Sequence, residues 1–256
     1  MKRFFALALA VLMVMSMFAG CKKAESGNEL GLIEDGKLIM STNAAFPPYE
    51  MTDDNGKFIG IDVEVAQAIA DKLGLELVID NMEFTAALEA AQKGKSDMVM
   101  AGVTVDEDRL MVMDFSDSYA KGVQVVIVPE NSSITKIEDL EGKKIGTQMG
   151  TTGYIYCSDD FGEESVVAYD NGITAVQALL KGQIDCVVID NAPAQAFVKE
   201  NAGLKILDTE YAVEDYAIGF AKGNTALKEA VNKALAELIA DGTVQKIVDK
   251  YIPAEQ

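Results

Sequence analysis

The chain has 256 residues, with 41 Asp and Glu against 22 Lys and Arg, which gives a formal net charge of −19 at pH 7. So acidic a surface repels nucleic acid and anionic lipid head groups, so we expect neither as a partner. Histidine is absent from the sequence, which excludes Ser-His-Asp and Cys-His nucleophiles and the usual zinc sites. We therefore expect no catalytic residue, no metal and no other cofactor.

The first twenty residues have the pattern of a secretory signal peptide. Lys2 and Arg3 precede an apolar run over 4–15, and small residues follow before Cys21. With its flanks, this run is too short for a stop-transfer helix. The stretch Phe18-Ala19-Gly20-Cys21 resembles a bacterial lipobox, with Phe where Leu is usual. Cleavage there would free the Cys21 thiol for diacylglyceryl attachment.

We expect residues 1–20 to be removed as a signal peptide and residues 21–32 to form the lipidated cysteine and a polar tether. This places the protein on the extracellular face of the cytoplasmic membrane. An uncleaved amphiphilic anchor is the alternative, and it also leads to a membrane. Cleavage removes two basic residues and no acidic ones, so the net charge of the mature protein becomes −21.

From residue 37 onward, short apolar runs alternate with longer amphipathic ones. They predict strands at 37–41, 75–79 and 97–101, and helices at 61–73 and 85–93. Gly74 stands at the C-cap position of the first helix. This alternation implies βαβ units and a mostly parallel sheet that helices cover.

The same alternation restarts after residue 133. It predicts strands at 144–148, 165–168 and 184–189, a helix beginning at 152 and another at 173–180. The stretch Leu88–Asp97 resembles Val176–Asp185, and an apolar strand follows each. Two related α/β lobes therefore fit the sequence better than one long sheet.

Two extended runs, 119–129 and 215–221, lie between the predicted lobes, and a helical pattern at 225–240 follows the second run. If the last helices return to the first lobe, the chain crosses twice and the crossings form a two-strand hinge. We predict that residues 33–122 and 215–256 form lobe 1 and residues 123–214 form lobe 2, with a ligand cleft between them.

Two cysteines, Cys157 and Cys186, lie within the predicted second lobe. A disulfide is possible in an exported protein. Cys186 occupies an apolar run typical of a buried strand. We favour two packed thiols and keep the disulfide as the alternative.

Arg109 is the single arginine of the mature chain, beside nineteen lysines. Lysine suffices as a surface cation, whereas the planar guanidinium of arginine binds a carboxylate with two parallel hydrogen bonds. One interpretation is therefore an anion-binding group. The other is a surface ion pair with Asp106, three residues earlier on the same helix.

In open α/β sheets, ligands bind at the carboxyl ends of the strands. Five predicted strand ends carry chemically useful residues: Asn43 and Phe46; Phe84; Ala101, Gly102 and Thr104; Gln148, Thr151 and Thr152; and Asp190. With Arg109, a helix start offers N–H groups to an α-carboxylate, and a fixed carboxylate such as Asp190 suits an α-ammonium. Phe46 and Phe84 suit the sides of an amino-acid side chain.

Each of these residues also has an ordinary structural interpretation. Thr104 opens a capping-box pattern, Asp190 could cap a helix, and so could Thr151 or Thr152. Single phenylalanines usually belong to the core. The joint occurrence at five strand ends favours a binding site.

Residues from about 37 to 251 resemble the amino-acid-binding receptors of ABC importers, the bacterial family 3 extracellular solute-binding proteins. The resemblance rests on Phe46–Glu50, Gly60–Glu64, Ala101–Arg109 with Asp114–Ser116, Gly142–Gly146 with Gly150–Thr152, and Asp190. It implies a periplasmic-binding-protein-like fold and an ABC permease as partner.

The resemblance also implies a role for each matching residue. Arg109 would clamp the α-carboxylate, assisted by amides near Gly102, Thr104 and Thr152. Asp190 would pair with the α-ammonium. The aromatic walls of the site would be Phe46 and Phe84.

Three positions depart from related receptors and bear on the ligand's side chain. Receptors for basic amino acids often carry an acid at the position of Asn43, and glutamine receptors often carry lysine at Gln148 and histidine at Ile189. The amides of Asn43 and Gln148, with Glu83 nearby, favour a polar side chain that donates and accepts hydrogen bonds.

The leading hypothesis is a monomeric, lipid-tethered receptor that closes its lobes on an L-amino acid and delivers it to a permease. An enzyme of the dehydratase type on the same fold is an alternative, with Glu83 as its candidate general acid. A ligand-sensing module that signals through a separate partner is another.

Overall fold

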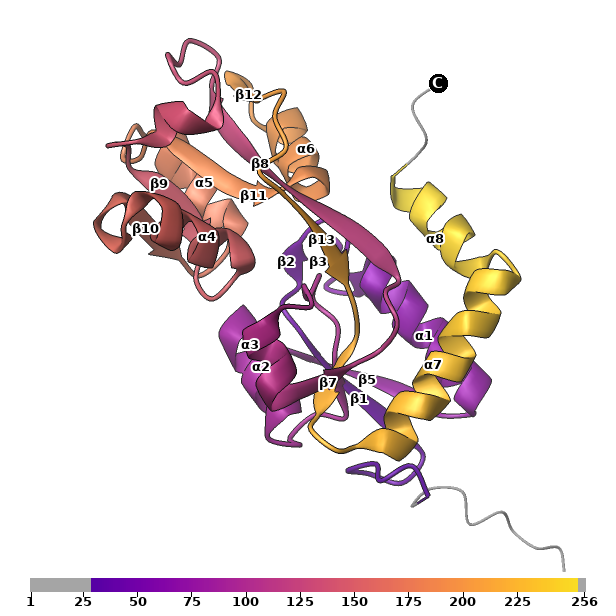
Figure 1. The fold of residues 1–256 in the computed structure, drawn as a ribbon. Coiled ribbons are helices and arrows are strands. Elements are labelled where there is room, and N and C mark those ends of the chain that lie inside the picture. The colour runs from indigo at the N-terminus through magenta and orange to yellow at the C-terminus, as the bar shows by residue number, and fades with distance from the viewer. Residues whose placement is uncertain (1–28, 253–256) are drawn as a thin grey trace, which may run out of the picture.

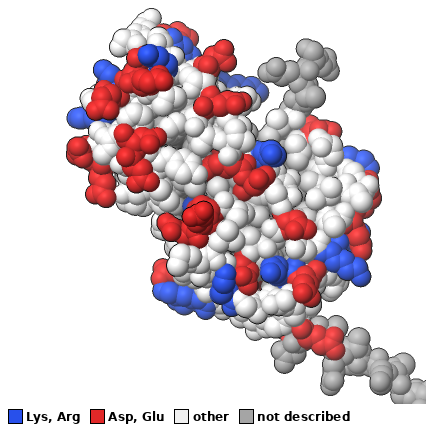
Figure 2. Space-filling view, in the orientation of Figure 1, with Lys and Arg blue, Asp and Glu red and all other residues white. Residues whose placement is uncertain are grey.

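A computed structural model describes residues 29–252, which form two α/β lobes (Figure 1). The predicted signal peptide, Cys21 and the tether up to residue 28 lie outside the described residues. Within residues 29–252, no helix is both long and apolar enough to cross a membrane. Acidic side chains are spread over both lobes on the face drawn in Figure 2.

The first lobe contains a sheet that has five strands in the described part of the chain. Their order is β5 (Glu76–Asn81), β1 (Lys37–Thr42), β6 (Met98–Val99), β14 (Gly219–Ala221) and β7 (Met113–Phe115). β1 pairs in parallel with β5 and β6, and β14 runs antiparallel to β6 and β7. A small antiparallel sheet of β2 (Ala45–Phe46), β3 (Glu50–Thr52) and β4 (Phe58–Ile59) lies beside it.

The helices of the first lobe are α1 (Ile61–Leu73), α2 (Phe84–Gln92), α3 (Glu107–Val112), α7 (Thr225–Ala240) and α8 (Thr243–Tyr251). α1 and α7 have the predicted bounds. Gly74 ends α1 in the left-handed conformation, at φ 70°. α1 packs against α7 and α8, so the C-terminal helices belong to the first lobe.

The second lobe is built around the sheet order β10 (Val166–Tyr169), β9 (Ile145–Gln148), β11 (Cys186–Asp190), β8 (Ala120–Pro129) and β12 (Leu204–Ile206). Its helices are α4 (Thr152–Phe161), α5 (Gly172–Leu180) and α6 (Asn191–Glu200), with short 3₁₀ turns η1 (Ile137–Leu140) and η2 (Glu163–Ser165). Cys157 and Cys186 are both free and buried within the described chain, in one apolar cluster, as the favoured interpretation predicted.

The two lobes are connected by β8 and by β13 (Ala212–Tyr216), which lie side by side and run antiparallel (Figure 1). The extended run predicted over 215–221 is in fact divided. Its first residues end β13, and residues 219–221 form β14 in the first-lobe sheet. The sequence pattern missed this division because both pieces are apolar and extended. The exact lobe boundaries stay a prediction.

Candidate functional site

A cavity with about 330 Å³ of space between atoms lies where the two lobes meet. Its wall consists of Asn43, Phe46, Glu50, Phe84, Ala101, Gly102, Thr104, Arg109, Gln148, Thr151, Thr152 and Asp190. Every residue predicted from the strand ends is in this wall, and sequence reasoning missed only Glu50. The structure therefore brings the predicted set together, and its role in ligand binding stays a prediction.

Arg109 is held by residues of its own lobe. Asp106 caps α3 by accepting a hydrogen bond from the Arg109 backbone N–H, at 2.7 Å, and its carboxylate lies 3.2 Å from Arg109 Nε. The ion pair considered from sequence therefore exists, but it is not a surface pair, because the Arg109 side chain is only 10% exposed. Burial lowers the pKa of the guanidinium, and the charge of Asp106 opposes that shift.

The guanidinium also contacts both lobes. Arg109 Nη1 donates to the carbonyl of Thr104 at 2.8 Å, and Nη2 donates to the carbonyl of Gly150 in the second lobe at 3.1 Å. Among residues 29–252, these contacts and Asp106 leave one N–H on each terminal nitrogen without a partner. The Phe84 ring packs 5.6 Å from the guanidinium carbon. Two such N–H groups match the two oxygens of a carboxylate.

Asp190 presents a carboxylate from the opposite lobe. It stands at the N-cap of α6, yet its side chain makes no capping hydrogen bond to any described residue. Instead Oδ2 accepts a hydrogen bond from Gln124 Nε2 at 2.9 Å. Oδ1 is buried and lacks a well-aligned donor within residues 29–252. The capping interpretation is therefore wrong for this side chain, whose nearest hydrogen-bonding groups are Gln124 and the Tyr216 hydroxyl.

The Asp190 carboxyl group has an altered affinity for protons. Burial raises its pKa to about 7, and the nearby charge of Glu214 adds to the effect, while Tyr216 and Gln124 oppose it. A neighbouring positive charge would lower this pKa again. The site therefore favours a cation next to Asp190.

The threonines divide between capping and lining roles. Thr151 is the N-cap of α4, because its hydroxyl accepts from the Tyr154 backbone N–H at 3.3 Å. Thr152 is buried in the first turn of that helix, whose N-terminus meets the cavity. Thr104 does not cap α3, since Asp106 does so. The backbone carbonyl of Thr104 instead accepts a hydrogen bond from the Arg109 side chain.

Asn43 and Gln148 contact each other across the lobes. Gln148 Nε2 donates to Asn43 Oδ1 at 3.0 Å and to the carbonyl of Asp170 at 3.1 Å, and Asn43 Nδ2 donates to the carbonyl of Met82 at 2.8 Å. Both N–H groups of the Gln148 amide thus have protein partners, whereas the Asn43 amide has a partner among the described residues for one of its two. Glu83, expected near the cavity, is instead exposed at the N-cap of α2 and is absent from the described cavity wall.

Glu50 is the wall residue that sequence reasoning missed. It begins β3 and is fully buried. A signal was present, because Glu50 ends an aromatic, proline-rich motif and lies between the apolar residues Tyr49 and Met51. A carboxyl group in such surroundings is rarely buried without a specific partner. Across residues 29–252, no cluster of three or more His, Cys, Asp or Glu side chains could hold a metal ion.

Comparison with known proteins places the chain in a family. It matches the bacterial extracellular solute-binding proteins, family 3, over residues 38–254. The chain is a family 3 solute-binding protein. The L-cystine-binding protein TcyJ of Escherichia coli K12 is 31% identical over 255 residues, which are 97% of this chain and 96% of that protein.

Solved structures agree with this assignment. The arginine-, lysine-, histidine-binding protein ArtJ of Geobacillus stearothermophilus has a TM-score of 0.82 and 32% identity, over 86% of this chain and 96% of that one. An ancestral arginine-binding protein bound to glutamine has a TM-score of 0.81 and 41% identity, over 86% of this chain and 100% of that one. The predicted family and fold class are confirmed. Since these relatives are described with different ligands, the ligand of this solute-binding protein must be inferred from its own cavity.

Proposed function

We propose that this solute-binding protein captures an L-amino acid with a polar side chain between its lobes and delivers it to an ABC permease. It would act as a monomer on the extracellular face of the membrane, anchored through Cys21. One observation carries the proposal: a single cavity is lined by the Arg109 guanidinium, with two N–H groups that have no partner among the described residues, and by the buried carboxyl group of Asp190.

A zwitterion suits this pair because it supplies both missing charges. Its carboxylate would occupy the guanidinium fork of Arg109 on the first lobe. Its ammonium would donate to Asp190 on the second lobe. Buried charges are costly unless they are paired, so the ligand favours the closed arrangement in which both pairs form.

The relatives support the amino-acid class. They are described as binding cystine, arginine, lysine and histidine, and one is bound to glutamine. All of these ligands share an α-carboxylate and an α-ammonium and differ in the side chain. The shared part fits Arg109 and Asp190, so the rest of the wall decides which amino acid binds.

The end of the cavity at Asn43 and Gln148 favours an uncharged side chain that donates hydrogen bonds. Among the described residues, the carbonyl oxygen of Gln148 is left as an acceptor and one N–H of Asn43 is left as a donor, so a side chain that both donates and accepts hydrogen bonds fits. Neither residue carries a charge that would offset a buried cation. A carboxamide such as that of glutamine meets both conditions.

We propose no catalytic role for this chain. The acid considered for an enzyme, Glu83, is exposed and lies away from the cavity wall. A sensing module would bind the same ligand but act without a permease. Uptake by liposomes that contain the cognate permease would separate these two possibilities, because only a transport receptor stimulates uptake.

A thermal melting screen tests the proposed ligand class. Residues 22–256 would be unfolded and refolded to remove bound ligand, and then heated with each common L-amino acid and its D-enantiomer. A ligand at a hundredfold its Kd adds about 2.7 kcal/mol to the free energy of unfolding, which raises Tm by several degrees. We expect a shift with L-enantiomers only, led by glutamine. A flat panel would contradict the proposal.

A further inference from the structure

Glu50 is as deeply buried as any carboxyl group of the cavity wall, but its surroundings differ from those of Asp190. Its exposed fraction is 0%, and neither carboxyl oxygen finds a conventional donor among the described residues. The group in hydrogen-bonding contact with it is the carboxyl of Asp62, which is also 0% exposed. Two buried acids therefore face each other beneath the cavity.

The backbone holds these two acids together. The N–H of Ile61 donates to the carbonyl of Pro48 at 3.0 Å, and the N–H of Asp62 donates to the carbonyl of Tyr49 at 2.9 Å. Gly60 makes this close approach possible: its φ is 128°, and a Cβ at this position would lie 2.2 Å from the Tyr49 carbonyl oxygen. The contact is thus built into the chain path and does not depend on side-chain rotamers alone.

Asp62 is the charged member of the pair. Its carboxylate accepts from the Gly102 backbone N–H at 3.0 Å and from the Tyr119 hydroxyl at 2.8 Å. Burial raises the pKa of Asp62 to about 6, and these two hydrogen bonds and one from Glu50 oppose the shift. Burial, followed by the charge of Asp62, raises the pKa of Glu50 well above its usual value.

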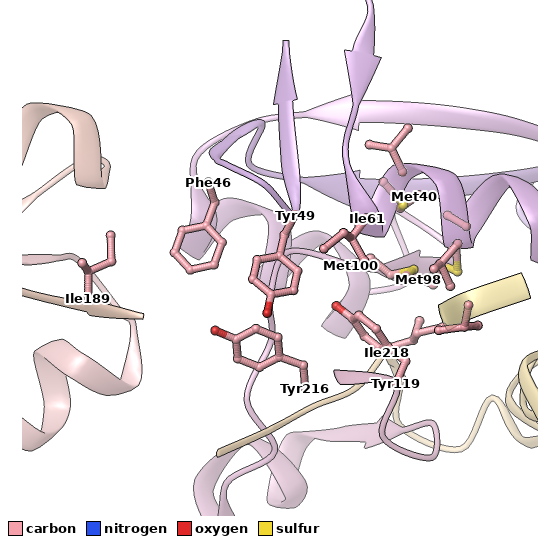
Figure 3. Close-up of a cluster of buried hydrophobic side chains, with 14 of the residues drawn as sticks. Met40, Phe46, Tyr49, Ile61, Met98, Met100, Tyr119, Ile189, Tyr216 and Ile218 are labelled. Carbon is pink, nitrogen blue, oxygen red and sulfur yellow. The ribbon is translucent and has the colours of Figure 1, made fainter. Parts of the chain in front are cut away.

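The other groups around Glu50 also favour its neutral form. The charges that act on it belong to Asp62 on α1 and Asp190 on β11, and both are acidic. The polar groups nearby are the hydroxyls of Tyr49 and of Tyr119 at the start of β8. In Figure 3, the Tyr49 ring lies next to the Tyr216 ring, in an edge-to-face arrangement with 5.2 Å between the ring centroids. Like charges this close and this buried do not both ionise.

We propose that Glu50 is a neutral acid whose O–H donates to Asp62, and that this pair is a positioning device for the ligand site. Through Asp62, it fixes the Gly102 amide at the cavity wall and Tyr119 at the start of the crossing strand β8. The inference rests on the proposed function, because the Gly102 amide matters to a ligand only if an anionic group binds beside Arg109.

A neutral Glu50 also explains how an acidic cavity accepts a carboxylate. An ionised Glu50 would repel an anion bound in the same cavity, since charges interact strongly at short range in a buried site. With its proton, Glu50 contributes a hydrogen bond and no charge. The negative charge of the wall is then concentrated on Asp190, on the opposite lobe from Arg109.

Two substitutions of similar size separate positioning from charge. Gln can donate an N–H to Asp62 in place of the acid's O–H, whereas Met cannot. With the L-amino acid that gives the largest shift in the melting screen, we expect Glu50→Gln to bind within about threefold of wild type. We expect Glu50→Met to bind about tenfold more weakly, because the hydrogen bond to Asp62 is lost and the Gly102 amide is displaced.

The same acid-to-amide change at Asp190 is the matched control. We expect Asp190→Asn to weaken binding more than about a hundredfold, because it leaves a buried ammonium without its counter-charge. The ratio of the Kd of Glu50→Gln to that of wild type should stay constant from about pH 5 to 8. A loss in Glu50→Gln as large as in Asp190→Asn would overturn the proposal, and so would wild-type affinity in Glu50→Met.

Measurements on the ligand-free protein test the pair independently of binding. Infrared spectra of wild type at pH 7 should contain a protonated-carboxyl band that Glu50→Gln removes. Asp190→Asn should retain this band, although it removes the other carboxyl group that is partly protonated at this pH. The NMR signal of the Gly102 amide should be retained in Glu50→Gln and shifted in Glu50→Met. If the band is present but no amino acid binds, the proposed function fails and the pair stands. If an amino acid binds and the band is absent, the pair fails.

Discussion

The two lobes bury acids against the same cavity in opposite ways. In the first lobe, Asp62 receives hydrogen bonds from Gly102 and Tyr119 and contacts Glu50. In the second, Gln124 Nε2 bridges Asp190 and Glu214 at 2.9 Å each, and the Tyr216 hydroxyl acts on Asp190. Burial alone therefore does not distinguish the two acids. Their positions do, because Asp190 is in the cavity wall and Asp62 is not.

The largest loss of binding is expected when the charge of Asp190, the cavity acid of the second lobe, is removed. Asp190→Asn should cost about 3 kcal/mol of binding free energy or more, because the ligand's ammonium would be buried unpaired. Calorimetric titration measures the loss. Asp159→Asn, an exposed acid of the same lobe, is the control and should bind as wild type does. If Asp190→Asn bound within about threefold of wild type, Asp190 would not be the partner of the ligand's ammonium.

The second-largest loss of binding is expected when Arg109, the cation of the first lobe, is replaced by lysine. Arg109→Lys should keep the fold but weaken binding by about 2 kcal/mol, because a point charge replaces a fork already held by Thr104 and Asp106. Titration with the amino acid and with its carboxamide derivative checks the cause. Wild type should strongly prefer the free acid, and the variant should lose most of that preference. An unchanged preference would return Arg109 to a structural role.

A smaller effect is expected where the second lobe approaches the crossing strand. A Cβ on Gly122 would lie 2.5 Å from Asp190 Oδ1 and 2.5 Å from the Tyr216 ring. Gly122→Ala should therefore displace the carboxylate and weaken binding about tenfold, as expected for overpacking at a rigid site. Lys121→Ala, at the exposed neighbouring position, is the control. Equal affinities in both variants would show that Asp190 has room to move.

The smallest effect is that of pH. The pKa of Asp190 is raised to about 7, so the folded, ligand-free protein binds this proton more tightly than the unfolded chain. The contribution of Asp190 to the free energy of unfolding, measured as the difference between wild type and Asp190→Asn, should fall as pH rises from about 4 to about 7 and stay constant above. Affinity should change in the opposite direction, with about a twofold loss from pH 8 to pH 7. Melting curves and titrations check both, and Asp190→Asn should abolish the pH dependence of binding.

Sequence patterns within a single segment predicted the bounds of α1 and α7 correctly. Apolar spacing and a terminal glycine define α1, and apolar spacing alone defines α7, so their bounds were correct. The wall residues came together because they follow strands whose carboxyl ends meet at the same side of each lobe. Fold class and candidate site were therefore accessible from sequence.

Contacts between distant segments were not accessible in this way. The partners of Asp190 and Asp62 are distant in sequence: Gln124 lies on β8 and Gly102 in the loop after β6. Glu83 precedes a wall residue in sequence, but as the N-cap of α2 it is exposed. The capping-box pattern suggested Thr104 as the cap of α3, and the structure shows Asp106 there.

The crossing strands carry a consequence for how receptors of this kind diversify. On β8, Gln124 lies opposite Asp190 of β11, and Gly122 lies opposite Glu214 of β13. In the proposed closure of the lobes, the segment that bends would therefore also position the Asp190 carboxyl group, which we propose binds the ligand's ammonium. A mutation on β8 would therefore alter both lobe closure and ligand binding, so few substitutions on this strand could select a new ligand. We expect new specificities to arise instead at Asn43 and Gln148, which can be exchanged without changing the crossing strands.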